Sequence, residues 1–245
     1  MRTVALAPGF GRKARRSRPG VRLGGPDSML ARIGTLPIHT VGQCGASARG
    51  AAADEWGCPV YGMVNKAVED LVRMNHGGET WRRIKERAGI DVEVFVSTEG
   101  YPDEMTYALV GAASEVLGAS AADILEAFGV HWVLHTAPDG YGAILDAAGG
   151  SLPEFLMNLN QMHTRVGMIF PNLKPPRFEC GEVTENSMLL HHHTERPGLG
   201  PMVKGLVIGL GKRFDTPVRV EQVQDREKGA DHDVFRVTWG PGAAG

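Results

Sequence analysis

The feature that most constrains the fold is a change of hydrophobic period about two thirds of the way along the chain. From residue 60 to about 168, apolar side chains recur every three or four residues, the spacing of amphipathic helices. Pro171, Pro175 and Pro176 end that pattern, and apolar and polar residues then alternate as in strands. Helices followed by strands predict an α+β fold, with an N-terminal helical subdomain followed by an antiparallel sheet with helices.

Glycine, proline and capping signals divide these two halves into elements. Gly77-Gly78 interrupts the first apolar stripe, Gly89 and Gly118 end later helices, and Ser120-x-x-Asp123 resembles a capping box. We expect helices over about 64–76, 81–88, 102–117, 120–128, 141–148, 152–168 and 205–214. We expect strands over 178–183, 187–193, 218–223 and 234–239, paired as two hairpins. A groove between the two subregions is a usual place for a cofactor.

Residues 1–59 differ in composition from the rest of the chain. They contain 24 Gly, Ala or Pro, nine basic and three acidic side chains, and no sustained hydrophobic period. Arg15-Arg16 is not followed by the apolar run that an export signal needs. We therefore interpret 1–59 as a disordered basic extension. Because regular pattern begins at Val60, a second hypothesis is that translation starts there. The domain then spans 60–240, and 241–245 form a tail.

The charge of the remaining chain excludes several classes of partner. Residues 60–245 hold the other 17 basic and 25 acidic side chains, a net charge of −8. Such a domain has no electrostatic reason to bind nucleic acid or anionic lipid. No segment approaches the ~18 apolar residues of a membrane span. Three scattered cysteines favour neither a disulfide framework nor a paired-cysteine zinc site. We expect a cytoplasmic protein without a membrane segment.

His163 is a candidate metal ligand on the last helix of the first half. It follows Leu159 by four positions and Phe155 by eight, so it projects near the apolar stripe. A half-buried histidine bonded to a backbone carbonyl is one interpretation. Histidine is also the usual proximal ligand of haem iron. A lone histidine suits haem better than zinc, which takes three or four protein ligands.

A second candidate group lies at the end of the 187–193 strand. If the strand continued, His192, Thr194 and Arg196 would share one face, because alternate side chains of a strand point the same way. Such a face suits a ligand with an apolar body and an anionic edge, since arginine grips carboxylates bidentately. A polar, exposed strand end is the alternative. His191 and His193 on the other face suggest a transition-metal site, but the sequence shows no third ligand.

These residues occur within a longer resemblance that covers Val60 to Trp239. That stretch resembles the haem-nitric oxide/oxygen-binding (H-NOX) domains, which are related to the haem domain of soluble guanylate cyclase. The resemblance is carried by Tyr61-Gly62-Met63-Val64-Asn65-Lys66-Ala67, Ser97-Thr98-Glu99-Gly100-Tyr101-Pro102, Gly140-Tyr141-Gly142, Glu154-Phe155-Leu156-x-Asn158-Leu159 and Pro175-Pro176. It implies an H-NOX fold with haem b held between the two subregions.

The resemblance also implies roles for individual residues. His163 matches the axial ligand of the haem iron, and Pro176 matches the proline that distorts the porphyrin. A Tyr-x-Ser-x-Arg signature that holds the haem propionates falls on His192-x-Thr194-x-Arg196. Threonine keeps the hydroxyl and arginine is unchanged, but the signature tyrosine is replaced by His192. Imidazole can still donate a hydrogen bond but titrates near neutral pH, so we expect haem to be retained, with looser or pH-dependent binding.

The resemblance also identifies residues on the gas-binding side. Oxygen-binding members of the family place a tyrosine three residues before a glycine, and counting back from Gly205 gives Met202, preceded by Pro201. Neither side chain donates a hydrogen bond to dioxygen. Trp132 carries an indole N–H whose position the sequence does not give. The resemblance and the missing donor together imply a sensor of nitric oxide, which also binds carbon monoxide and excludes oxygen.

The chain ends shortly after Trp239, so the resemblance implies signalling to a separate effector, a histidine kinase or a diguanylate cyclase. Two other functions stay open. A haem enzyme would need a distal acid–base pair, for which His131 and His135 are candidates by residue type alone. A binding module of the same fold without haem would hold an apolar acid.

Overall fold

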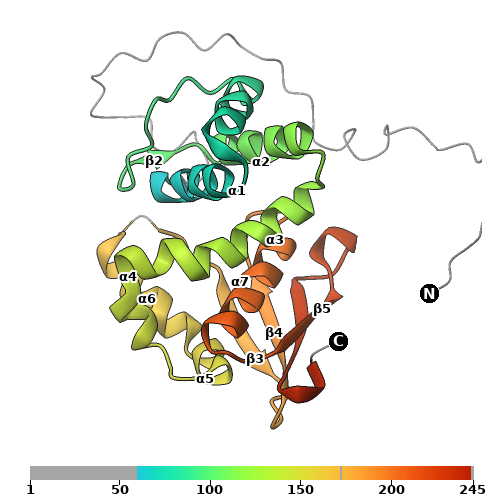
Figure 1. The fold of residues 1–245 in the computed structure, drawn as a ribbon. Coiled ribbons are helices and arrows are strands. Elements are labelled where there is room, and N and C mark those ends of the chain that lie inside the picture. The colour runs from blue at the N-terminus through green and yellow to red at the C-terminus, as the bar shows by residue number, and fades with distance from the viewer. Residues whose placement is uncertain (1–59, 172, 244–245) are drawn as a thin grey trace, which may run out of the picture. The chain divides into compact units, whose positions relative to one another are not determined.

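The structure is a computed structural model that describes residues 60–171 and 173–243 (Figure 1). The described residues belong to one compact unit. The expected basic extension (1–59) and the last two residues of the expected tail lie outside the described residues. Among the described residues, no single helix is long and apolar enough to span a membrane, although 103–117 and 121–146 pass as a pair bent by 112°.

The first part of the described chain is helical, as predicted. It contains α1 (Gly62–Ala88), α2 (Asp103–Leu117), α3 (Ala121–His131) and α4 (Ala137–Asp146), with a two-residue pairing of β1 (Val60–Tyr61) and β2 (Gly100–Tyr101). Gly77 has φ 82° and ψ 167°, which breaks α1 where the sequence predicts an interruption. The Ser120–Asp123 capping box is present, and left-handed Gly89 and Gly118 end α1 and α2.

Two of the helix predictions need correction. Residues 152–168 form α5 (Leu152–Met157) and α6 (Leu159–Ile169) rather than one helix. The break occurs at Asn158, whose side chain donates a hydrogen bond of 2.8 Å to the carbonyl of Ala148. The helix expected from Tyr141 begins earlier, because α3 continues through a π-helical turn, η2 (Trp132–Thr136), into α4. Tyr141 itself is a kink, at φ −136° and ψ 21°.

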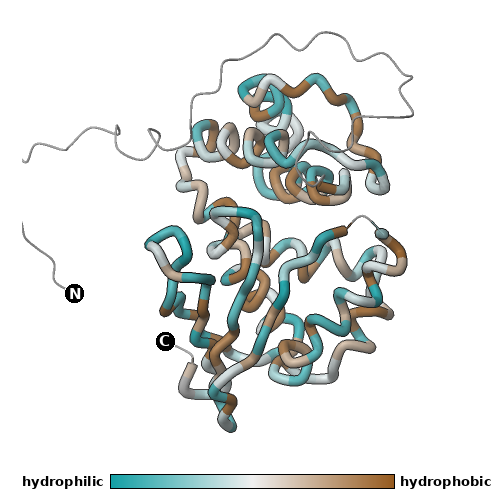
Figure 2. Tube along the Cα trace, turned by 180° about the vertical axis from the view of Figure 1, so that it is seen from behind, coloured by the Kyte–Doolittle hydropathy of each residue, from teal (hydrophilic) through white to brown (hydrophobic). Residues whose placement is uncertain are grey.

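The second part is an antiparallel sheet of β3 (Arg177–Gly181), β4 (Ser187–His193), β5 (Val218–Gln224) and β6 (Asp233–Trp239), in the order β3-β4-β6-β5. Both expected hairpins are present, and pairing of β4 with β6 joins them. Hydrophobic and hydrophilic segments alternate along the tube (Figure 2). Short 3₁₀ turns, η3 (Arg226–Lys228) and η4 (Pro241–Ala243), precede and follow β6.

Helix α7 (Gly200–Arg213) covers the inner face of this sheet and begins five residues earlier than expected. Pro201 suits its first turn, where no intrahelical N–H is needed. Gly205 lets α7 approach α3, because a Cβ there would collide with the backbone carbonyl of Glu126. The same holds for Gly129 of α3, where a Cβ would collide with the carbonyl of Met202. This close contact sets the position of the α7 side chains that face the sheet.

Candidate functional site

A small apolar cavity lies between α7, the inner face of the sheet, the η2 turn and helices α4 to α6. Its volume is about 100 Å³, and its walls come from η2, α4, α5, α6, β3, β4 and α7. The lining side chains are Trp132, Val133, Ala137, Leu145, Phe155, Leu156, Leu159, Met162, His163, Phe178, Leu190, Val203, Leu206, Val207 and Leu210. Only His163 and Trp132 among them carry a nitrogen in the side chain. The cavity therefore suits an apolar ligand that makes one specific polar contact.

His163 brings that contact from the middle of α6. Its Nδ1 is buried, and no described residue offers it a hydrogen bond of acceptable geometry. Burial lowers the pKa of His163 to about 4, while the nearby Pro176 carbonyl acts in the opposite direction. The ring lies 5.9 Å from that of Phe178, centroid to centroid. At neutral pH the imidazole is thus uncharged and has a free lone pair, which is the form that binds a metal.

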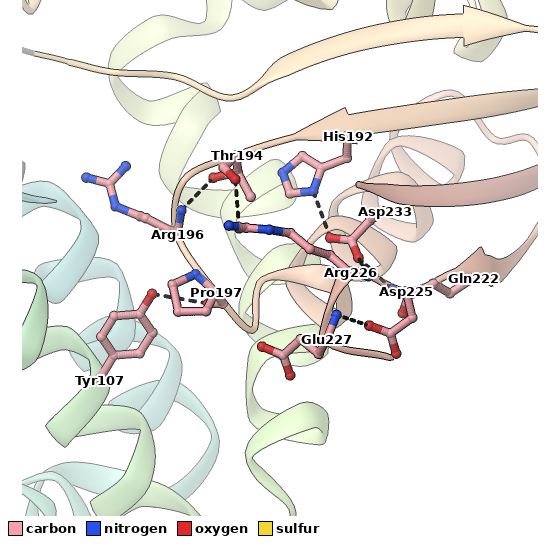
Figure 3. A network of polar contacts seen from close by, with 10 residues as sticks. All are labelled: Tyr107, His192, Thr194, Arg196, Pro197, Gln222, Asp225, Arg226, Glu227 and Asp233. Carbon is pink, nitrogen blue, oxygen red and sulfur yellow. Dashed lines mark hydrogen bonds and ion pairs between the residues drawn. The ribbon is translucent and has the colours of Figure 1, made fainter. Parts of the chain in front are cut away.

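His192 occupies a different environment from the one predicted. It is 1% exposed and points into the core from β4, and its Nδ1 lies 3.3 Å from Oδ2 of Asp233 (Figure 3). The other oxygen of Asp233 accepts hydrogen bonds of 3.0 Å from the Gln222 side chain and the Arg226 backbone. Burial is the main cause that lowers the pKa of His192, and Asp233 opposes it. His192 is therefore a buried partner of Asp233.

Thr194 and Arg196 lie beyond the end of β4, so strand alternation does not align them with His192. This corrects the expected single face of three donors. Instead they line a second, polar pocket of about 670 Å³, whose walls also include Pro176 and Tyr107. Among the residues that the structure describes, this pocket and the apolar cavity share no lining side chain.

Arg196 already holds a carboxylate in this pocket. Its Nε and one Nη donate to the two oxygens of Asp103 at 2.7 and 3.4 Å, which joins α2 to the segment after β4. The backbone N–H of Arg196 also donates to Oγ1 of Thr194 at 3.2 Å, and Arg226 donates to the Thr194 carbonyl at 2.8 Å (Figure 3). A ligand carboxylate at Arg196 would compete with Asp103.

The predicted gas-side residues do not line the apolar cavity in the described structure. Pro201 and Met202 lie in the first turn of α7, and Met202 packs against the helical core. The α7 side chains that do line the cavity are Val203, Leu206, Val207 and Leu210. All four are aliphatic. The part of α7 that lines the cavity therefore offers no hydrogen-bond donor, as was expected for Pro201 and Met202. Trp132, which the sequence left unplaced, lines the cavity.

Asp103 and Asp233 are the polar residues that sequence reasoning missed. Asp233 pairs directly with His192 across β4 and β6, so the register of the two strands is the signal that identifies it. No comparable signal exists for Asp103, which is 93 positions from Arg196. His131, which is 5% exposed, and His135 are candidates for a distal pair by residue type alone, and neither of them lines the described apolar cavity.

The donors present fit a haem group, although the space is smaller than the ~300–1,000 Å³ of typical ligand sites. A neutral, unpaired imidazole in an apolar cavity suits a porphyrin iron. A guanidinium that already grips a carboxylate suits a propionate. Haem entry would require this cavity to widen.

Comparison with known proteins agrees with this chemistry. Residues 61–222 match the haem-NO-binding family. Soluble guanylate cyclases gcy-32 and gcy-37 of Caenorhabditis elegans are 30% and 31% identical to the chain over 71% and 73% of its length. The chain spans about a quarter of each of these relatives, 26% in both cases.

Solved structures support the fold. An H-NOX protein from S. oneidensis in the Fe(II)NO state has a TM-score of 0.68 at 19% identity, covering 74% of this chain and 99% of its own. An unliganded Fe(II) H-NOX mutant from K. algicida has a TM-score of 0.64 at 23% identity, covering 74% and 97%. The chain belongs to the haem-NO-binding family and has the H-NOX fold, that of haem-based gas-sensing domains.

Proposed function

We propose that residues 60–240 form a sensor of nitric oxide that binds the gas at ferrous haem b, excludes oxygen and signals to a separate effector. The observation that carries this proposal is the neutral imidazole of His163, whose Nδ1 is buried without a partner among the described residues, in an apolar cavity. The haem would supply a ferrous iron that binds a diatomic gas. The remaining roles belong to the side chains.

His163 would hold the iron from α6, while Arg196 and Thr194 would hold the propionates. Asp103 would have to yield its two contacts with Arg196 for this to occur. His192 would act indirectly, by packing against Phe178, whose ring centroid lies 5.2 Å away, on the side opposite its contact with Asp233. Pro176 would limit how flat the cofactor can lie, because its ring is rigid.

Oxygen exclusion is supported by the side chains of α7. Bound dioxygen is polar and is stabilised by a hydrogen-bond donor, whereas nitric oxide and carbon monoxide bind ferrous haem without one. Val203, Leu206, Val207 and Leu210 offer no donor along α7. The indole N–H of Trp132 is the remaining candidate in the described lining.

Signalling would depend on α6, because His163 is part of that helix. His163 would link α6 to the haem, and a change in that contact would let α6 shift against β3, to which Asn160 ties it by two hydrogen bonds with the backbone of Phe178. The effector would read the altered surface. A histidine kinase or a diguanylate cyclase is the proposed class of partner.

The test is the absorption spectrum of the haem-loaded chain, reduced, under argon, then air, then nitric oxide. We expect a ferrous Soret band that air leaves unchanged and nitric oxide shifts. A stable oxygen complex in air would refute the selectivity. Absence of a Soret band after haem reconstitution would refute the haem site and favour a haem-free module that holds an apolar acid.

A further inference from the structure

We propose that His193, His232 and Asp231 form a binding site for a divalent transition-metal ion on the outer face of the sheet. The three residues line the polar pocket that also contains Thr194 and Arg196, and none of them lines the apolar cavity. The sequence offers two histidines on this face of β4 but no third ligand. The fold supplies the missing ligands from the segment that leads into β6.

Strand register brings these residues together. β4 and β6 pair antiparallel, with His191 opposite Val234 and His192 opposite Asp233. β6 begins at Asp233, and His232 lies immediately before it, with its ring stacked on that of His193. Because alternate residues of a strand face opposite sides, His193 projects away from the core into which His192 points.

The ligand atoms are close enough for one ion. One atom each from His193, Asp231 and His232 lie within 4.8 Å of one another. Ligands around tetrahedral zinc, at bonds of about 2.0–2.2 Å, are roughly 3.3 Å apart. His232 Nδ1 is already 3.0 Å from Asp231 Oδ2, and the rings of His193 and His232 stack with centroids 4.1 Å apart. A small rotation of the His193 ring would close the site.

Two further observations indicate that the ligand nitrogens are available and oriented for a metal ion. His193 Nε2 is buried, and no described residue provides it with a hydrogen bond. His191 Nδ1 lies 2.8 Å from His232 Nε2, which leaves Nδ1 of His232 to face Asp231. A second residue that fixes the other ring nitrogen of a histidine ligand is the usual support of a metal site.

The types of ligand atom favour a borderline ion such as Zn²⁺. Two imidazoles and one carboxylate form the donor set of many zinc sites, and a water molecule would complete it. Lys174, Arg177 and Arg226 line the same pocket, and Arg177 forms an ion pair with Glu179. Glu179 Oε2 also lies 3.8 Å from His193 Nε2.

The test is a titration of the full-length chain, first stripped of metal, with Zn²⁺ alone in competition with a chromophoric chelator. The wild type should bind one more Zn²⁺ per chain than the His193→Ala/His232→Ala variant. His191→Phe should weaken that site by about 10–100-fold, the usual effect of losing a supporting residue. His76→Ala, at an exposed histidine of α1, is the matched control and should bind as the wild type does.

Asp231→Asn is a second variant, used in case the double histidine variant does not fold. The Asp231 side chain is 93% exposed, so its replacement should not disturb the fold. It should fold normally, by circular dichroism, and lose at least about 10-fold in Zn²⁺ affinity. The proposal is overturned if the double histidine variant keeps the wild-type number of bound ions. If that variant does not fold, wild-type affinity in Asp231→Asn overturns it. Cysteines elsewhere in the chain contribute equally to every variant and so cancel in the comparison.

Discussion

His131 and His163 have similar local properties but face different surroundings. Both lie on helices, both have a buried ring nitrogen without a partner among the described residues, and burial lowers the pKa of both. His131 packs in the helical subdomain, with its ring centroid 4.8 Å from that of His135. His163 instead faces an apolar cavity. A buried neutral histidine is thus a candidate ligand only where the fold leaves space beside it.

The largest effect is expected at Arg196, which would hold the propionates of the haem that His163 binds. Arg196→Ala should weaken haem binding by about 10–100-fold, corresponding to the 1.5–3 kcal/mol of a hydrogen bond to a charged group. Arg196→Lys should have a haem affinity between those of the wild type and Arg196→Ala, because lysine keeps the charge but not the bidentate geometry. Haem transfer to apomyoglobin measures the loss.

Asp103→Asn provides the matched control for Arg196. It should slow haem loss, because the amide competes less strongly than the carboxylate for the guanidinium. If both Arg196→Ala and Asp103→Asn leave haem transfer unchanged, the polar pocket is not the propionate site.

The next effect concerns the free energy of unfolding, which we expect the buried His131 to lower. His131→Leu should raise the free energy of unfolding by about 1–3 kcal/mol, because it removes a buried polar nitrogen without a partner. The pKa of His131 is lowered in the folded state, so below pH 6.5 the unfolded chain takes up the proton first. Wild-type stability should therefore fall as the pH drops below 6.5, and less so in the variant.

Urea denaturation at pH 7.5 and pH 5.5, in samples with equal haem content, measures this difference. His76→Leu replaces an exposed histidine of α1 and should reproduce the wild-type dependence on pH. An equal loss of stability in wild type and His131→Leu would show that His131 is not the group that titrates.

The smallest effect is expected at Trp132, whose indole nitrogen is the second side-chain nitrogen in the cavity lining. Trp132→Phe should change carbon monoxide affinity by less than about threefold, under 1 kcal/mol, because this ligand needs no donor. It should also leave the protein without a stable oxygen complex. Gas titration followed by absorption measures both. A stable oxygen complex that appears only in the variant would show that Trp132 keeps oxygen out.

The sequence predicts the architecture well where local signals are strong. Period and glycine placement identify most of the elements, including the break at Gly77 and the capping box at Ser120. The break at Asn158 is missed because it depends on a hydrogen bond to Ala148, ten positions away. The continuation of α3 through η2 into α4 is missed because a π-helical turn has no clear hydrophobic period.

The candidate site is predicted less completely, because its contacts join distant segments. His163 is identified from its place on an apolar helix. Strand alternation places His192 on the core face, but it does not reveal that β4 ends at His193 and that Arg196 binds Asp103 of α2. Such long-range pairs depend on how the subdomains pack, which no local pattern encodes.

Chemical rescue of the iron ligand is the most direct test of the central claim, that His163 holds haem iron where His131 does not. The ferrous spectrum of haem-loaded His163→Gly should be recorded with and without free imidazole, with His131→Leu as the control. We predict that His163→Gly loses the wild-type Soret band and regains it when imidazole is added, while His131→Leu retains it throughout. A wild-type ferrous spectrum in His163→Gly without imidazole would contradict the claim.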